Sequence, residues 1–219
     1  MAINIHRFHL DKFDPLALYQ YLCPQGPGLL ESLNPLPKTG RFSIVPLRWQ
    51  ERYKLCDNQL YRCTEDKKVR LEGDPFARLA QTLVQRAVEP SLDTPFPGGY
   101  FGYFGYDLAA QIETLPRAAK RDLPIPELNL YWVDVTAVYD HRNEQLTLAT
   151  LDPEVNLLNL ETAVIASQKP LKAGTLDVVQ RPEAIINQSQ FEQMVQQGKE
   201  YIASGDIYQV NLSCRFDGR

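Results

Sequence analysis

The chain has 219 residues, a length typical of one large domain or two small ones. Hydrophobic residues make up 44% of it and charged residues 23%, which excludes an intrinsically disordered chain. The formal net charge of −4 gives no overall excess of positive charge of the kind typical of proteins that bind nucleic acid. The 16 prolines favour short strands and loops over long helices, so we expect a β-rich globular protein.

The spacing of the cysteines and the sequence of the N-terminus bear on the cellular compartment in which the protein is expected. The four cysteines are too irregularly spaced for a disulfide scaffold, and none forms a C-x-x-C zinc motif. The N-terminus lacks the charged start and apolar run of a signal peptide. No stretch approaches the ~18 consecutive apolar residues of a membrane span. We therefore expect a cytoplasmic protein with no membrane partner.

The first 71 residues alternate between short apolar segments and turns. Asp14 and Pro15 predict the start of a short helix, because these residue types favour the cap and the first helical position. Its expected apolar face comprises Leu16, Tyr19, Leu22 and Cys23. Strands are predicted over residues 3–10, 28–32, 41–47, 53–56, 60–63 and 67–71. We expect Cys56 and Cys63 to face each other across a hairpin as packed thiols.

The middle of the chain contains the clearest periodic patterns. Asp74 and Pro75 predict the start of a helix whose apolar residues repeat at helical spacing up to Val88. Strands are predicted over residues 99–105, 128–139 and 145–151, and a helix over 157–166. Residues 1–151 are therefore expected to form one domain, and residues 152–188 a linker that contains a helix.

The pattern restarts near the C-terminus. Ser189 and Glu192 form a predicted capping box at the start of a helix. Residues 208–216 alternate apolar and polar, which predicts a strand with one buried face. One helix and one strand cannot form an independent core, because domains usually need about 50 residues or more. We interpret residues 189–219 as the start of a truncated second domain and the chain as a fragment.

The most conspicuous motif is the glycine-rich segment of residues 98–107. Its spacing is G-x-x-G-x-x-G, which differs from the G-x-G-x-x-G of a dinucleotide-binding loop, and no Gly-Lys-Ser/Thr follows. We interpret it as a buried strand whose glycines allow another backbone or an aromatic ring to approach closely. The three histidines are interpreted as surface or packed side chains. From the residues alone, no catalytic constellation is predicted.

Two strings identify a family resemblance. Residues 98–108 (Gly-Gly-Tyr-Phe-Gly-Tyr-Phe-Gly-Tyr-Asp-Leu), with Glu-Thr-Leu-Pro at 113–116, resemble the chorismate-using synthases related to anthranilate synthase component I. Residues 201–212 (Tyr-Ile-Ala-Ser-Gly-Asp-Ile-Tyr-Gln-Val-Asn-Leu) resemble the same family. The resemblance implies an α+β fold, with an N-terminal lobe of sandwiched β-sheets and flanking helices. Residues 189–219 would then be the first helix and strand of the chorismate-binding domain.

Within the family, the string Gln-Val-Asn-Leu at 209–212 is similar to the aminodeoxychorismate branch. That branch aminates chorismate to 4-amino-4-deoxychorismate, for 4-aminobenzoate and folate, with ammonia from a glutamine amidotransferase subunit (component II). The string Leu-Leu-Glu-Ser at 29–32 is common among anthranilate synthases, which serve tryptophan biosynthesis and are inhibited by tryptophan. A stand-alone amino-acid-binding module is the third alternative.

The resemblance also implies where the catalytic groups lie. In the family, glutamates that bind Mg²⁺ and, in the aminodeoxychorismate branch, a lysine in a Pro-Ile-Lys-Gly-Thr string belong to the C-terminal lobe. This chain contains neither the family's glutamate motif nor the Pro-Ile-Lys-Gly-Thr string. We therefore assign no catalytic or metal-binding residue, expect Mg²⁺ and chorismate to bind downstream of Arg219, and expect the chain alone to be inactive.

The N-terminal lobe of relatives supplies an L-tryptophan pocket. By resemblance, the matching residues are Ser32, Thr39, Gly40, Arg41 and Phe42. A serine hydroxyl and strand-edge backbone groups can bind the ammonium and carboxylate of an amino acid, and apolar side chains can enclose an indole. The alternative is that Ser32 only forms hydrogen bonds with the local backbone.

Overall fold

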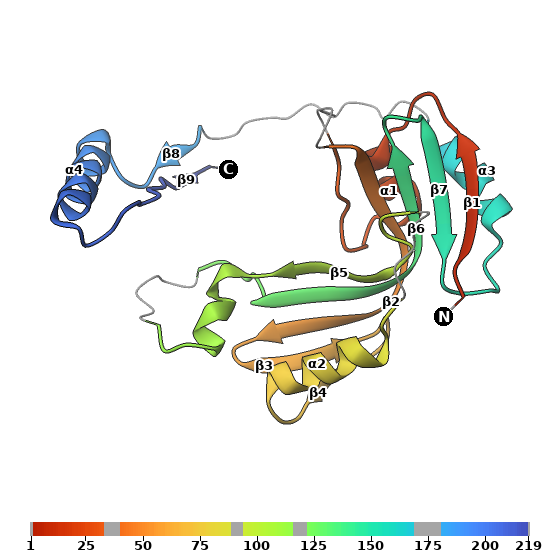
Figure 1. Cartoon of the computed structure of the whole chain (residues 1–219), viewed down its shortest axis with the longest axis horizontal. Helices are drawn as coiled ribbons and strands as arrows, with labels where there is room; N and C mark the ends of the chain where they lie inside the picture. The colour runs from red at the N-terminus through yellow and green to blue at the C-terminus, as the bar shows by residue number, and fades with distance from the viewer. Residues whose placement is uncertain (1, 33–39, 89–93, 116–121, 169–180, 219) are drawn as a thin grey trace. The chain divides into compact units, whose positions relative to one another are not determined.

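The computed structural model describes residues 2–32, 40–88, 94–115, 122–168 and 181–218. The chain divides into two compact units, Met1–Leu171 and Lys172–Arg219 (Figure 1). Among the residues described, no helix combines the length and the apolar character needed to cross a bilayer.

The first unit contains an antiparallel sheet and helices that pack against it. In chain order its elements are β1 (Asn4–His9), α1 (Pro15–Leu22), β2 (Phe42–Cys56), β3 (Gln59–Cys63), β4 (Lys68–Leu71), α2 (Pro75–Gln85), β5 (Gly99–Phe104), the 3-10 helix η1 (Tyr106–Gln111), β6 (Leu128–Asp140), β7 (Gln145–Thr150) and α3 (Leu157–Ser167). The predicted α+β class is confirmed.

The seven strands described in this unit belong to one sheet. The order is β1-β7-β6-β2-β3-β4, and β5 pairs with β6 beside β7. The first half of β6 pairs with β5 and its second half with β7, while β2 pairs along nearly the whole of β6. Figure 1 shows β2 and β6 turning between these two halves. The layers of the expected sandwich are thus, in this unit, two halves of one bent sheet.

Strand β2 differs from the prediction of two separate strands at 41–47 and 53–56. It is continuous over 15 residues, with register shifts against β6 between Pro46 and Glu51. Proline has no N–H to donate, so it interrupts the sequence pattern, and a bulge accommodates it within the strand. The long partner β6 supplies the continuous template that the sequence of β2 does not reveal.

The hairpins that follow have the predicted turns. Asp57 and Asn58 both have positive φ angles, which suits the tight turn between β2 and β3. The register, however, pairs Cys56 with Gln59 and Cys63 with Arg52. The expectation that the two cysteines face each other is wrong, because the two-residue turn fixes a register in which they are far apart along the hairpin.

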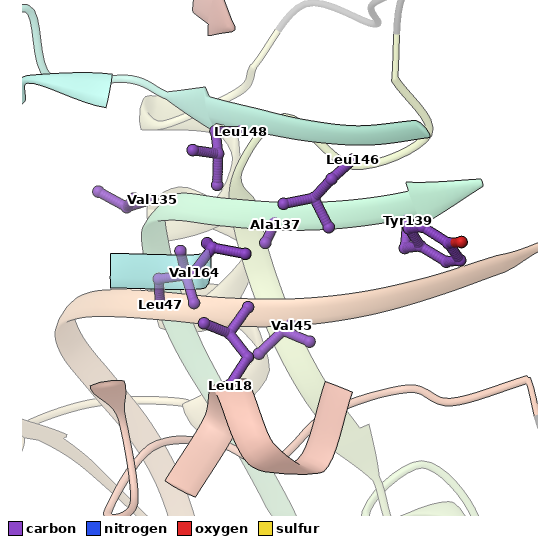
Figure 2. Close-up of a cluster of buried hydrophobic side chains, with 9 residues drawn as sticks. All are labelled: Leu18, Val45, Leu47, Val135, Ala137, Tyr139, Leu146, Leu148 and Val164. Atoms are coloured by element: carbon purple, nitrogen blue, oxygen red, sulfur yellow. The ribbon is translucent and has the colours of Figure 1, made fainter. Parts of the chain in front are cut away.

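Two hydrophobic cores lie on the two halves of the sheet. The first core comprises Leu18, Val45, Leu47, Val135, Ala137, Tyr139, Leu146, Leu148 and Val164 (Figure 2). The second core comprises Tyr53, Leu55, Leu60, Leu79, Leu108, Leu128 and Leu130. Helices α1 and α3 contribute to the first core, and α2 and η1 to the second.

Helix α1 begins as predicted, and Tyr19 and Leu22 of its predicted apolar face pack against the first core, but the face is rotated away from Leu16. Asp14 accepts a hydrogen bond from the backbone N–H of Ala17 at 2.8 Å, which confirms the cap. Leu18 is fully buried, whereas Leu16, predicted to face the core, is 44% exposed. A helix of only eight residues has a poorly determined apolar stripe, and packing against β2 selects the face that contains Leu18.

Helices α2 and α3 also begin near their predicted positions. Asp74 caps α2, which ends at Gln85, before the expected Val88. Asn156 caps α3. We predicted that α3 belongs to a linker over 152–188, but Val164 is part of the first core and the first unit extends to Leu171. The helix belongs to the first unit because its apolar side buries against the sheet.

The second unit consists of α4 (Gln188–Ser204) and a two-stranded sheet of β8 (Glu183–Ala184) and β9 (Phe216–Asp217). The capping box of α4 is formed by Asn187 and Gln190, two residues before the predicted pair. Along α4 only Gly198 is buried. Most of the predicted strand at 208–216 is wrong: among the described residues only Phe216 of this segment pairs, with Ala184, since a strand requires a hydrogen-bonding neighbour.

Candidate ligand-binding site

The predicted site residues lie where the chain enters β2. Segment 28–32 is not the expected strand: it makes a single bridge, in which Leu30 and Ile44 exchange backbone hydrogen bonds of 2.9 and 2.7 Å. This bridge brings Ser32 beside Phe42, while Gly40 and Arg41 directly precede the strand. Thr39 lies outside the described residues.

Ser32 is bonded to the start of β2. Its hydroxyl donates to the backbone carbonyl of Phe42 at 2.7 Å, and its N–H donates to the hydroxyl of Ser43 at 3.1 Å. These are the local backbone contacts expected under the alternative interpretation of Ser32. The hydroxyl oxygen can still accept hydrogen bonds, so its chemistry suits the ammonium of a ligand better than the carboxylate.

Arg41 is paired with a residue that the sequence did not point to. Its guanidinium donates to both carboxylate oxygens of Asp140, the closest contact being 2.6 Å, and stacks 4.7 Å above the ring of Phe42. The Arg41 side chain is 41% exposed, whereas that of Asp140 is 11% exposed. Arg41 therefore mainly orients Phe42 and neutralises Asp140.

A serine–histidine pair lies beside these residues and was not predicted. The Ser43 hydroxyl is 2.8 Å from Nε2 of His141, whose ring packs edge-on against Tyr139. Such a pair can activate a hydroxyl as a nucleophile when a substrate reaches it. Ser43, however, is fully buried, so the pair holds the start of β2 against the end of β6.

The Arg41–Asp140 pair predicts a pH dependence of stability. Burial alone would raise the pKa of Asp140, but hydrogen bonds from Arg41 and from the N–H of Arg142 outweigh it, so the pKa is lowered. A lowered folded-state pKa stabilises the fold at neutral pH, and this contribution is lost as pH falls below about 4 through the folded-state pKa.

We expect Asp140→Asn to lower the free energy of unfolding at pH 7 by about 1–3 kcal/mol, because it removes charge-assisted hydrogen bonds. The variant should also lose less stability than the wild type between about pH 4 and pH 2. Urea unfolding at a series of pH values measures both effects. Asp66→Asn, at an exposed turn, serves as the control. Parallel stability–pH curves for wild type and Asp140→Asn would contradict the assignment.

The cluster of possible metal ligands found among the described residues does not suit magnesium. Within them, one group of three possible ligands, His9, Asp11 and Glu144, has donor atoms within 4.8 Å of one another, and all three side chains are exposed. Mg²⁺ favours oxygen ligands in octahedral geometry, and this group offers an imidazole and two solvated carboxylates. These residues do not fit the ion that the family resemblance implies.

Comparison with known proteins gives consistent family matches. A sequence model of the family described as "chorismate binding enzyme" matches residues 43–219. Aminodeoxychorismate synthase component 1 of Escherichia coli (strain K12) is 31% identical over 153 residues, which cover 69% of this chain and 33% of that protein. The protein of the same name from Bacillus subtilis (strain 168) is 32% identical over 206 residues, which cover 85% of this chain and 41% of that protein.

Other relatives have a different name. Anthranilate synthase component 1 of Lactococcus lactis subsp. lactis (strain IL1403) is 26% identical over 222 residues, which cover 97% of this chain and 48% of that protein. The crystal structure of anthranilate synthase component I from Streptococcus pneumoniae TIGR4 shares the fold, with a TM-score of 0.60, 23% identity and coverage of 99% of this chain and 50% of that one. The chain spans about a third to a half of these proteins.

Proposed function

The chain belongs to the family of chorismate binding enzymes, and on that premise we propose that it is part of a synthase that converts chorismate and ammonia into 4-amino-4-deoxychorismate. The observation that carries this proposal is the string Gln-Val-Asn-Leu at residues 209–212, which is similar to the aminodeoxychorismate branch. The names of the Escherichia coli and Bacillus subtilis relatives support the same branch.

The proposed reaction replaces the C4 hydroxyl of chorismate with an amino group, and one water leaves for each ammonia that is incorporated. The product serves 4-aminobenzoate and folate synthesis. A glutamine amidotransferase subunit is the proposed source of ammonia, and Mg²⁺ the proposed ion that holds the chorismate carboxylate. Because the family resemblance assigns the magnesium-binding glutamates and the lysine to the C-terminal lobe, and the Pro-Ile-Lys-Gly-Thr string is absent from this chain, we propose that both sites belong to sequence outside these 219 residues.

Anthranilate synthase is the second candidate. The string Leu-Leu-Glu-Ser at residues 29–32 favours it, as does the name of the Lactococcus lactis relative. The two activities share the substrate and the ammonia donor but give different products. Product identity therefore separates them.

The test uses the reading frame that encodes this chain, expressed to its stop codon. With chorismate, Mg²⁺ and ammonium, we expect 4-amino-4-deoxychorismate, detected by mass spectrometry. Anthranilate as the main product would contradict the proposed aminodeoxychorismate synthase activity and favour anthranilate synthase. Neither product from a folded protein would overturn the synthase proposal. The 219-residue chain alone should give no product above a protein-free control, and turnover by it would show that catalytic groups lie within these residues.

The tryptophan pocket remains a prediction and has its own test. If Ser32 accepts a hydrogen bond from the ligand ammonium, Ser32→Ala should weaken tryptophan binding about ten- to a hundred-fold, since a hydrogen bond to a charged group contributes ~1.5–3 kcal/mol. Calorimetric titration of the expressed reading frame measures the affinity, and turnover on chorismate should change little. Equal affinity for both proteins would show that Ser32 only holds the backbone of Phe42.

A further inference from the structure

A polar cleft lies in the first unit, far along the sheet from the residues around Ser32. It has a volume of about 470 Å³ and is bounded by α2 and by β2, β3 and β4. Figure 1 shows α2 alongside β3 and β4. The charged side chains that line it are Glu51, Arg62, Arg70, Glu72, Arg78 and Arg86. We call it the arginine cleft, because arginines outnumber carboxylates two to one in its lining.

The floor of the arginine cleft is a saturated ion-pair network. The Glu51 side chain is 1% exposed and receives Arg62 on one oxygen and Arg86, at 2.7 Å, on the other. The Tyr53 hydroxyl adds a hydrogen bond of 3.2 Å to Glu51. Arg86 also stacks over the ring of Trp132. These contacts fix two guanidinium groups in place around a single negative charge, so the floor has a net positive charge.

Two further arginines, Arg70 and Arg78, lie at the rim of the cleft, and their guanidinium groups form few hydrogen bonds. Arg70, on β4, comes closest to the Glu72 carboxylate at its Nε, 3.6 Å away, which is too far for a hydrogen bond. Arg78, on α2, donates through Nε to the backbone carbonyl of Glu72 at 2.8 Å. Among the described residues, the Nη groups of both arginines form no hydrogen bond. Several N–H donors on the rim are therefore available.

The ligand class follows from size and chemistry. A volume of about 470 Å³ falls within the range of small-molecule sites. The planar guanidinium fork matches carboxylate and phosphate groups, which it binds through two parallel hydrogen bonds. The fixed positive floor supplies attraction without the entropy of ordering flexible side chains. An apolar ligand would leave these charges unsolvated, so it is disfavoured.

We propose that the arginine cleft binds a small multivalent oxyanion, a phosphate or a di- or tricarboxylate, between Arg70 and Arg78. This site is independent of the chorismate chemistry proposed above. The competing explanation is that the arginines are solvated and that Arg70 only protects β4, the edge strand of the sheet, from pairing with other chains.

The test titrates the 219-residue chain with inorganic pyrophosphate and, separately, with citrate at constant ionic strength, by calorimetry and by NMR of the arginine Nε–H signals. We expect saturable one-to-one binding of at least one probe, with shifts of the Arg70 and Arg78 signals. The tighter probe assigns phosphate or carboxylate as the ligand class. Failure of both probes to saturate the folded protein would overturn the proposal.

Variants distinguish specific binding at Arg70 and Arg78 from nonspecific electrostatic attraction of the anion to the protein. Arg70→Gln and Arg78→Gln should each weaken binding at least about ten-fold, because each removes charge-assisted hydrogen bonds. The polar partner of both residues is the exposed Glu72 and not the buried Glu51, so the fold should persist, as circular dichroism can check. Arg70→Lys should recover part of the affinity. Lys12→Gln removes one exposed charge elsewhere in the unit. Equal weakening by Lys12→Gln, or none by the rim variants, would overturn the site.

Discussion

Replacing Gly102 with alanine is expected to destabilise the first unit by about 3 kcal/mol or more, because it forces a side chain into a neighbouring backbone. Gly102 lies opposite Leu130 in the pairing of β5 with β6 and has a φ of +152°. A Cβ atom there would lie 1.9 Å from the carbonyl oxygen of Asn129. A backbone carbonyl cannot rotate away as a flexible side chain can, so the two strands must separate.

Gly28→Ala is the matched control for this variant. Gly28 also has a positive φ, +96°, but an added Cβ would meet nothing within 4 Å. The free energy of unfolding of Gly28→Ala should fall only by the cost of backbone strain, about 1–2 kcal/mol. Urea unfolding followed by tryptophan fluorescence measures both, since Trp132 packs edge-on against Tyr100 of β5 at 4.9 Å. Equal losses in the two variants would show that close approach to Asn129 does not constrain position 102.

The glycine-rich segment illustrates what local sequence can predict. Its interpretation as a strand whose glycines allow close backbone approach is confirmed by β5 and by the closeness of Gly102 to Asn129. The prediction that this strand is buried is wrong for its second half, since residues 102–104 are exposed. The caps at Asp14 and Asp74 were likewise predictable, because a capping side chain bonds to an N–H only three residues away. Interactions between residues only a few positions apart can therefore be predicted from the local sequence.

The contacts that sequence reasoning missed join residues far apart in the chain. Asp140 is 99 residues from Arg41, and His141 is 98 residues from Ser43. Both pairs exist only because β2 and β6 are adjacent in one register, which no local pattern specifies. The arginine cleft has the same origin, since its lining comes from three strands and a helix. Sequence patterns predicted the elements but could not predict which side chains the sheet brings together.

One buried carboxylate, Asp134, lies between the two halves of β6, and removing it is expected to have the second large effect. The Asp134 side chain, 2% exposed, accepts two hydrogen bonds from Arg48, the shorter of 2.6 Å, and one of 2.6 Å from Gln50. Arg48 and Gln50 lie in the stretch of β2 where the register against β6 shifts. The backbone carbonyl of Asp134 also accepts a hydrogen bond from the N–H of Leu151. Asp134 thus connects the bulge of β2 with the end of β7.

Asp134→Ala should therefore lower the free energy of unfolding by about 2–3 kcal/mol, because it removes three charge-assisted hydrogen bonds to a buried carboxylate, whose donors on the exposed Arg48 and Gln50 must then turn to water. Asp152 provides the matched control, since it binds the same Arg48 group at 2.7 Å but its side chain is 28% exposed. Asp152→Asn should cost at most about 1 kcal/mol, as surface ion pairs do. Chemical unfolding of both variants tests the difference, with hydrogen exchange of β2 amides as a local readout. If Asp152→Asn cost as much as Asp134→Ala, the stabilising group would be Arg48 itself, regardless of which carboxylate holds it.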